Sequence, residues 1–294
     1  MRLEDIGFYT LSDYRASQSS GSSPLWRCEL LLTDRCNFKC PYCRGLQNPL
    51  RGDISKADAQ KTIDLWGRAG LKNIRFSGGE PTLWNGLISL VEYAKSLGVK
   101  RIALSTNGSA PLRIYRRLIS AGVDDISVSL DACCAAVGEK MCGGIRGAWG
   151  HVVDTLRAIS QMTHVTVGVV VNDQNLAGVA KTIALADSLG VADIRIIPSA
   201  QYGPTIPGIC SLDQEIIERH PILKYRLNNL LAGRPFRGLS TNDSKSCYLV
   251  RDDMAVCGGY HFPCIIYLRE GGHPIGRVGP LMREERDEWY VNHD

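Results

Sequence analysis

The sequence predicts an α/β fold, a partial (β/α)6 barrel of the TIM-like kind with a small α+β extension at its C-terminal end. Between residues 26 and 200, short aliphatic or β-branched runs alternate with longer helical patterns, and the pair repeats every roughly 30 residues. Glycine follows several of the helical patterns, just before the next aliphatic run. Because neighbouring parallel strands require a crossover, this alternation indicates a parallel sheet with helical connections.

The expected elements follow one another in a regular order. Aliphatic runs predict the strands, and apolar residues at helical spacing predict the helices between them. Gly70, Gly98, Gly122 and Gly190 each lie where a left-handed residue would end a helix. The expected strands are 29–33, 73–77, 101–105, 125–130, 165–171 and 193–197, and the expected helices are 56–69, 83–97, 110–121, 148–162 and 176–189.

The predicted barrel core, 26–200, lies between a lead-in at 1–25 and a C-terminal extension or cap at 201–294. Residues 16–24 are rich in serine and are expected to be flexible or loosely packed. After residue 200 the strand and helix alternation stops. The extension is expected to hold a helix over 213–231 interrupted near Pro221, short strands with glycine-rich turns over 247–278, and a charged surface helix over 283–290.

Composition limits the class of protein. A chain of 294 residues with 44% apolar residues can bury one large core. The net charge of +4 is spread without a basic block, so nothing favours nucleic-acid binding. No apolar run approaches the roughly 18 to 20 residues of a membrane span, and the N-terminus lacks a signal-peptide core, so we expect a cytoplasmic protein without a membrane partner. Eleven unevenly spaced cysteines favour metal binding over disulfides.

Three cysteines, Cys36, Cys40 and Cys43, follow the first expected strand with the spacing C-x3-C-x2-C. Cysteine thiolates hold iron–sulfur clusters, and three of them in one short stretch can ligate three irons of a cubane and leave the fourth open. An open iron suits chemistry on a bound molecule, as an open position does in catalytic zinc sites. The alternatives are a zinc knuckle or buried free cysteines, although a second C-x2-C hook, typical of zinc sites, is missing from the sequence.

The triplet, with Tyr42 directly before its third cysteine, resembles the signature of the radical S-adenosylmethionine (SAM) superfamily. The resemblance covers about residues 28–198 and is closest to the subgroup that includes molybdenum cofactor biosynthesis protein A and the SPASM/Twitch enzymes. It implies that a 4Fe–4S cluster on the three cysteines cleaves SAM reductively, so that a 5'-deoxyadenosyl radical removes hydrogen from a substrate. It also implies an external one-electron reductant of the flavodoxin or ferredoxin type.

Further segments match the family in order along the chain. The Gly-Gly-Glu sequence after the second expected strand resembles the motif whose backbone and carboxylate receive the methionine amino group. Segments ending the third and fourth strands resemble those that line the ribose and carboxylate, although turn formation or helix capping would also explain them. Arginine before the helix at 148–162 is expected to pair with the carboxylate. The implied cofactor-binding residues are Tyr42, Gly78, Gly79, Glu80, Thr106, Asn107, Ser129 and Arg146.

A second group of cysteines lies in the extension. Cys247, Gly259 and Cys264 follow a C-x11-G-x4-C pattern that resembles the hairpin opening an auxiliary iron–sulfur site in SPASM and Twitch domains. Because no cysteine follows Cys264, Cys257 or Cys210 would have to complete the set. The alternative is that these are core thiols and that the segment is a cap over the barrel.

The substrate and any catalytic side chain are not identified by these motifs, because the first radical step requires no general base. The short lead-in leaves no room for a winged peptide-recognition domain, which favours a small molecule such as a nucleotide, sugar or amino-acid derivative over a peptide. Cys133, Cys134 and Cys142 follow the fourth expected strand, where a reactive thiol or an inert one would fit. The alternative to an enzyme is a non-catalytic protein that binds zinc or an iron–sulfur cluster.

Overall fold

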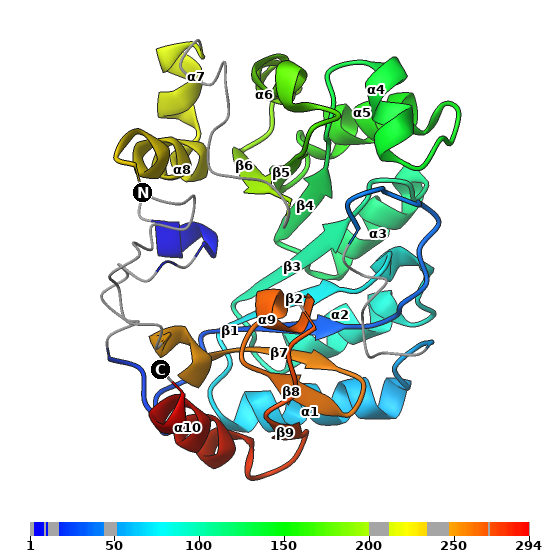
Figure 1. The fold of residues 1–294 in the computed structure, drawn as a ribbon. Helices are drawn as coiled ribbons and strands as arrows, with labels where there is room; N and C mark the ends of the chain where they lie inside the picture. Colours follow the sequence, from blue (N-terminus) through cyan, green and yellow to red (C-terminus); the bar gives the residue numbers. More distant parts are fainter. Residues whose placement is uncertain are drawn as a thin grey trace.

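The computed structural model describes residues 3–8, 10, 18–43, 52–199, 212–233, 247–269 and 271–293. Its centre is a nine-stranded sheet with the order β6-β5-β4-β3-β2-β1-β7-β8-β9 (Figure 1). The strands β1 to β6 are parallel neighbours, as the alternating pattern predicts. Their bounds are β1 Arg27–Leu31, β2 Asn73–Ser77, β3 Arg101–Thr106, β4 Asp125–Ser129, β5 His164–Val171, β6 Asp193–Pro198, β7 Asp253–Cys257, β8 Tyr260–Phe262 and β9 Gly276–Arg277.

Helices connect the parallel strands and cover the outer face of the curved sheet (Figure 1). Ser55 begins the first of them, because its side chain accepts a hydrogen bond from the Asp58 amide. Gly122, with a φ of 116°, ends the third in a left-handed conformation. The helices are α1 Lys56–Arg68, α2 Leu87–Ser96, α3 Leu112–Ala121, α4 Ala135–Met141, α5 Ala148–Ile159, α6 Val179–Ser188, α7 Gln214–Arg219, α8 Pro221–Leu231, α9 Ile265–Arg269 and α10 Met282–Asn292.

The predicted partial α/β barrel is confirmed, with local differences. The first strand ends at Leu31, because Thr33 leaves the ladder and forms an isolated bridge with Asp53. The helix expected at 83–97 begins only at Leu87, after a 3-10 turn at Pro81–Leu83. Helix α4 was not predicted, since it is short and contains Gly138.

The C-terminal extension continues the barrel sheet. Strand β7 pairs in parallel with β1, so that Cys28 lies opposite Met254 and Leu31 opposite Cys257. Strands β8 and β9 then add an antiparallel edge. The Trp66 indole of α1 donates to the Met254 sulfur of β7 at 2.9 Å. This contact joins a helix of the barrel core to a strand of the extension. The domain boundary near residue 200 stays a prediction, because residues 200–211 lie outside the described ranges.

The lead-in, expected to be flexible, is held by side-chain contacts over its described part, 18–24. Ser19 donates to the Tyr248 carbonyl at 2.7 Å, and Arg283 of α10 donates to the Ser20 carbonyl at 2.8 Å. Nearer the N-terminus, Phe8 packs with Ile222 of α8 in a small apolar cluster.

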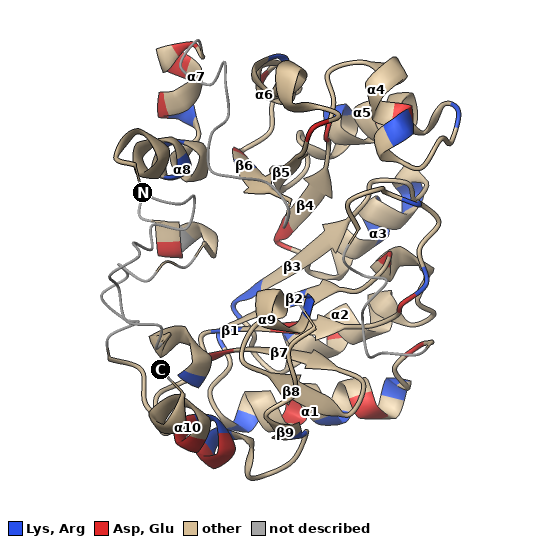
Figure 2. Ribbon diagram, in the orientation of Figure 1, with Lys and Arg blue, Asp and Glu red and all other residues tan. Residues whose placement is uncertain are grey.

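Acidic and basic residues line α10 and α1 (Figure 2). No helix in the described part of the chain is long and apolar enough to cross a membrane.

Candidate active site

The loops that follow parallel strands meet at one edge of a barrel, where such folds place their active sites. The loop after β1 carries Cys36, Cys40 and Cys43. The loop after β2 begins at Gly78, and the loop after β3 begins at Asn107. Because β2 pairs with both β1 and β3, the three predicted motif segments lie side by side.

Two glycines allow the loop after β2 to lie directly on the cysteine loop. The Gly79 amide donates to the Thr33 carbonyl at 2.7 Å, and the Glu80 amide donates to the Arg35 carbonyl at 2.8 Å. A Cβ at Gly78 would lie 2.4 Å from the Thr33 oxygen, and a Cβ at Gly79 would lie 2.3 Å from the Arg35 oxygen. Glycine is therefore required here by the protein's own backbone. Contact of these glycines with a methionine amino group stays a prediction.

The Glu80 carboxylate is buried, with 0% of the residue exposed. Its Oε1 accepts from the Thr82 amide at 3.0 Å, from the Thr82 hydroxyl at 2.6 Å and from the Thr106 hydroxyl at 2.8 Å. Its Oε2 accepts from the Asn107 amide at 2.7 Å. Burial raises the pKa of Glu80, and these hydrogen bonds oppose that effect. The carboxylate therefore ties the β2 and β3 loops together, and its predicted role toward an ammonium group stays a prediction.

The three thiols of the β1 loop differ in environment. Cys36 and Cys40 are half-buried, and Cys43 is exposed. Burial raises the pKa of Cys36, and burial together with Asp131 raises the pKa of Cys40 to about 12. Cys43 contributes to the raised pKa of both other thiols, so it lies near each of them.

Tyr42 links the cysteine loop to the far side of the barrel mouth. Its hydroxyl donates to Asp131 Oδ2, at the end of β4, while Asp131 Oδ1 accepts from the Val170 amide at 2.7 Å. The Asn175 side chain donates to the Asp131 carbonyl at 2.8 Å. Burial raises the pKa of Asp131 to about 6, and the hydrogen bonds from Tyr42 and Val170 oppose that effect.

A pocket lies between these loops and brings four predicted site residues together, one of them a cysteine of the triplet. They are Cys40, Tyr42, Asn107 and Ser129. Thr106 is buried and is not among the residues that line the pocket. Arg146 is exposed on the loop between α4 and α5 and is not among the pocket residues. The two glycines and Glu80 are likewise set back from it.

Sequence reasoning missed three parts of the pocket wall. Trp149, at the start of α5, donates to the Ala132 carbonyl at 2.8 Å and covers Gly138 of the unpredicted helix α4. Cys142, considered only as a loop thiol, lines the pocket, and burial and Asp131 raise its pKa to about 11. Asp131 appeared only within a motif segment. The available signal in the sequence was the pair Gly138 and Trp149, on the two sides of the loop that joins α4 to α5.

The C-terminal cysteines do not form one visible ligand set. Cys257, 1% exposed, packs in an apolar cluster with Leu31 and Phe262. Cys247 and Cys264 are close enough for Cys264 to raise the pKa of Cys247. Cys210 lies outside the described residues. Within the described ranges, no three His, Cys, Asp or Glu side chains lie close enough together to hold a metal ion, and this holds for Cys36, Cys40 and Cys43 as well, so both the first cluster and a second one stay predictions.

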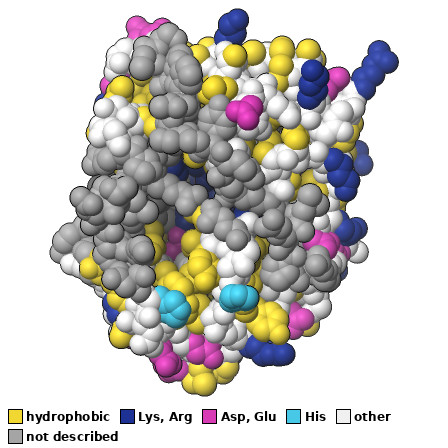
Figure 3. Space-filling model, in the orientation of Figure 1, with side chains coloured by type: hydrophobic (Ala, Val, Ile, Leu, Met, Phe, Trp, Pro, Cys, Tyr) yellow, Lys and Arg dark blue, Asp and Glu magenta, His cyan; other side chains and the backbone are white. Residues whose placement is uncertain are grey.

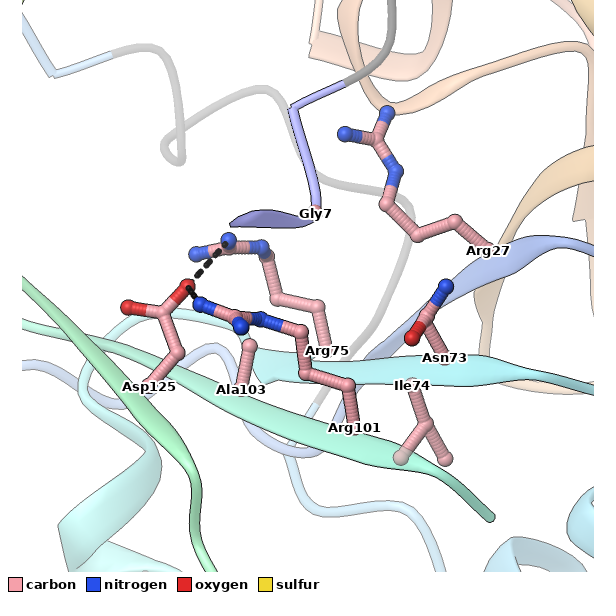
Figure 4. Close-up of a pocket in the computed structure, with 8 residues that line it drawn as sticks. All are labelled: Gly7, Arg27, Asn73, Ile74, Arg75, Arg101, Ala103 and Asp125. Atoms are coloured by element: carbon pink, nitrogen blue, oxygen red, sulfur yellow. Dashed lines mark ion pairs between the residues drawn. The ribbon is translucent and has the colours of Figure 1, made fainter. Parts of the chain in front are cut away.

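The inner face of the barrel is rich in arginine. Outward-facing residues of β2 to β4 pack under the helices, and the alternate residues face inward. Arg75 and Arg101 converge on Asp125, with Nη2 to Oδ2 distances of 3.7 Å and 3.3 Å (Figure 4). Arg27 pairs with Asp253 of β7. Basic side chains are visible at the bottom of the central hollow (Figure 3).

Arg195 of β6 is a further inward arginine with few polar contacts. Its Nη2 lies 3.5 Å from the Ser127 hydroxyl, and its buried Nε has no hydrogen-bond partner in the described part of the chain. Burial and the charges of Arg75 and Arg226 lower the pKa of Arg195 to about 9, and Glu29 offsets part of this effect. A buried guanidinium with unused donors is a site that favours an anion.

Sequence comparison relates the chain to known enzymes. The family model described as the Radical SAM superfamily matches residues 30–186. A protein named "Probable GTP 3',8-cyclase" from Saccharolobus islandicus strain M.14.25 is 31% identical over 179 residues, which cover 59% of this chain and 57% of the relative. GTP 3',8-cyclase from Mannheimia succiniciproducens is 37% identical over 108 residues, covering 35% of this chain and 32% of that protein. The match therefore spans little more than half of the Saccharolobus relative and about a third of the Mannheimia relative.

Solved structures share the fold at low sequence identity. Streptococcus suis SuiB bound to S-adenosylmethionine matches with a TM-score of 0.65 and 13% identity, covering 92% of this chain and 66% of SuiB. The protein anSMEcpe with bound AdoMet and Cp18Cys peptide matches with a TM-score of 0.61 and 15% identity, covering 90% of this chain and 82% of that one. These likenesses concern the mixed α/β partial barrel alone.

Proposed function

This chain belongs to the radical SAM superfamily, and from that premise we propose that it holds a 4Fe–4S cluster on Cys36, Cys40 and Cys43 and cleaves SAM reductively. The observation that carries the proposal is the position of the cysteine loop. It leaves the end of β1 at the barrel mouth, and backbone hydrogen bonds from Gly79 and Glu80 fasten it to the next loop.

The residues of the loop fit the cluster by their chemistry. Three soft thiols within one loop suit iron, and they supply three ligands for four irons. A reduced cluster held by these thiols would supply the electron for reductive cleavage of SAM, the chemistry that would generate a 5'-deoxyadenosyl radical for hydrogen abstraction. Because burial raises the pKa of Cys36 and Cys40, both thiols are protonated in the metal-free chain, and cluster assembly must release these protons. An external one-electron reductant, of the flavodoxin or ferredoxin type, completes the proposal.

We assign the SAM site to the pocket beside the cysteine loop. Tyr42 and Trp149 supply apolar walls, and the exposed Ser129 supplies a hydroxyl at the end of β4. Arg146, on the loop beside this pocket, remains our candidate partner for the methionine carboxylate. We assign Gly78, Gly79 and Glu80 a supporting role, because their backbone and carboxylate already bind the protein's own loops.

The inner arginines support a small, negatively charged substrate. Arg195 is a buried cation whose Nε has no hydrogen-bond partner in the described structure, and the positive charge of Arg75 contributes to lowering its pKa. A carboxylate or phosphate would accept from these guanidinium groups and offset their desolvation. The relatives named GTP 3',8-cyclase carry a nucleotide in their names, which agrees in charge with such a ligand. The alternative is a peptide substrate, and direct binding measurements would distinguish it from a small anion.

The test is SAM cleavage by anaerobically reconstituted protein. The brown protein should absorb near ~400 nm and release 5'-deoxyadenosine after reduction by dithionite. Cys36→Ala, Cys40→Ala and Cys43→Ala should each abolish this product, because each removes one cluster ligand. The exposed Cys134→Ala is the matched control and should keep wild-type cleavage. Full cleavage by any of the three ligand variants, or a colourless zinc-bound wild type, would overturn the proposed function.

A further inference from the structure

We propose that Asn107 is a positioning residue of the cluster site: held by Glu80, it donates a hydrogen bond to the Cys36 sulfur and raises the reduction potential of the cluster. This inference rests on the proposed function, since it requires Cys36 to be a cluster ligand. It differs from the family resemblance, which implies that Asn107 lines the SAM site.

The contacts of the Asn107 side chain fix its orientation. Its Nδ2 lies 3.7 Å from Cys36 Sγ and 2.9 Å from Asn37 Oδ1. Its Oδ1 accepts from the Ser109 amide at 2.9 Å. Because a backbone amide can only donate, the side-chain oxygen must face Ser109, and the NH2 group must face the Cys36 turn. The whole amide is therefore engaged within the protein.

Glu80 places Asn107 at this position. The Glu80 Oε2 accepts from the Asn107 backbone amide at 2.7 Å, while Oε1 accepts from the preceding Thr106 hydroxyl at 2.8 Å. On its other side, the Glu80 amide donates to the carbonyl of Arg35, directly before Cys36, at 2.8 Å. Hydrogen bonds to a buried carboxylate are among the stronger ones, so one residue fixes both the donor and the acceptor.

The consequence for the cluster follows from charge. A ligand sulfur carries negative charge, which increases when the cluster accepts an electron, and an N–H donor directed at that sulfur stabilises the reduced state. The Phe38 amide supplies one such donor at 3.4 Å, and Asn107 supplies a second from a different strand end. Removal of the second donor should therefore make the cluster harder to reduce.

The experiment is a redox titration of reconstituted protein without SAM, followed by electron paramagnetic resonance. Asn107→Leu preserves side-chain size and removes the donor. At the wild-type midpoint potential, the ratio of reduced to oxidised cluster should fall by about threefold to tenfold, the usual effect of one hydrogen bond. Asn107→Ser introduces a shorter polar side chain that cannot reach Cys36, so it should shift the ratio in the same direction. This second variant keeps the test valid if the Leu variant misfolds.

Ser109→Ala is the matched control. It removes the hydroxyl that contacts Asn37 but leaves the Asn107 amide on Cys36, so it should titrate like the wild type. Wild-type potentials in both Asn107 variants, with a full cluster, would overturn the inference and leave the proposed function intact. A wild-type protein that assembles no cluster on its three cysteines would overturn both.

Discussion

The hydroxyl of Tyr42 donates to the buried Asp131, and this contact joins the cysteine loop after β1 to the end of β4 across the pocket. Asp131 is in turn fixed by the Val170 amide of β5. The wall of the SAM pocket that we propose thus depends on a contact between residues far apart in the chain. Its strength can be measured by removing one oxygen atom.

Tyr42→Phe should lower the free energy of unfolding by about 1 to 3 kcal/mol, because it leaves a buried carboxylate without one of its donors. It should also weaken SAM binding, since the ring loses its anchor beside the pocket. Thermal unfolding and equilibrium binding check the two effects. Tyr93→Phe is the matched control, because Tyr93 donates to Asp64 on the helical surface, and its effect should be clearly smaller. Equal stability losses in the two variants would contradict a special role for the buried pair.

Arg195→Met should weaken the binding of an anionic ligand by at least about tenfold, because charge-assisted hydrogen bonds contribute about 1.5 to 3 kcal/mol. The free energy of unfolding should stay unchanged or rise, since the variant removes a buried charge that has poor partners in the free protein. Calorimetric titration with a panel of nucleotides and carboxylic acids measures the first effect, and thermal unfolding the second.

The exposed Arg157→Met serves as the control for the Arg195 variant. Arg157 pairs with Asp154 on the exposed surface of α5, and its replacement should leave ligand affinity unchanged. Two results would contradict the proposal that the inner face of the barrel binds an anion. One is a wild-type protein that binds none of the anions, and the other is an Arg195 variant with wild-type affinity.

The alternation of strands and helices over residues 26–200 was predictable because it depends on local patterns, whereas the pairing of β7 with β1 and the site depend on distant partners. Glycines such as Gly122 mark helix ends within a few residues of the pattern that they terminate. Tyr42 and Asp131, however, lie 89 positions apart, and no local signal pairs them. Arg195 did leave a signal. A charge in the middle of an aliphatic parallel strand is unusual, since both faces of such strands are ordinarily apolar.

Stability should depend on pH through Asp193, at the start of β6. This residue is buried, and its carboxylate accepts from the Ile222 amide at 3.1 Å, at the beginning of α8. Burial raises its pKa to about 6, which means that folding favours the protonated form. Its contribution is therefore fully present below the unfolded pKa of 3.8 and is lost as the pH rises through 6.

Asp193→Asn should remove this pH dependence. Relative to the wild type, the variant should gain about 1 to 3 kcal/mol of unfolding free energy between pH 4 and pH 7.5, because each unit of pKa shift corresponds to about 1.4 kcal/mol. Urea unfolding of the metal-free chain at several pH values checks this. A stability difference that stays constant with pH would show that Asp193 does not titrate in this range.

The reconstituted protein should bind about four irons, because we expect a single 4Fe–4S cluster. Cys257 lies in an apolar cluster with Leu31 and Phe262, which among the described residues leaves Cys247 and Cys264 as a pair of thiols rather than the three or four that a cluster needs. The segment around them then serves as a cap, extending the sheet beside β1. The Cys36/Cys40/Cys43 triple Ala variant should accordingly hold almost no iron, and Cys257→Ala should hold the wild-type amount. About eight irons in the wild type, with about four retained by the triple variant, would instead establish a second cluster in the C-terminal extension.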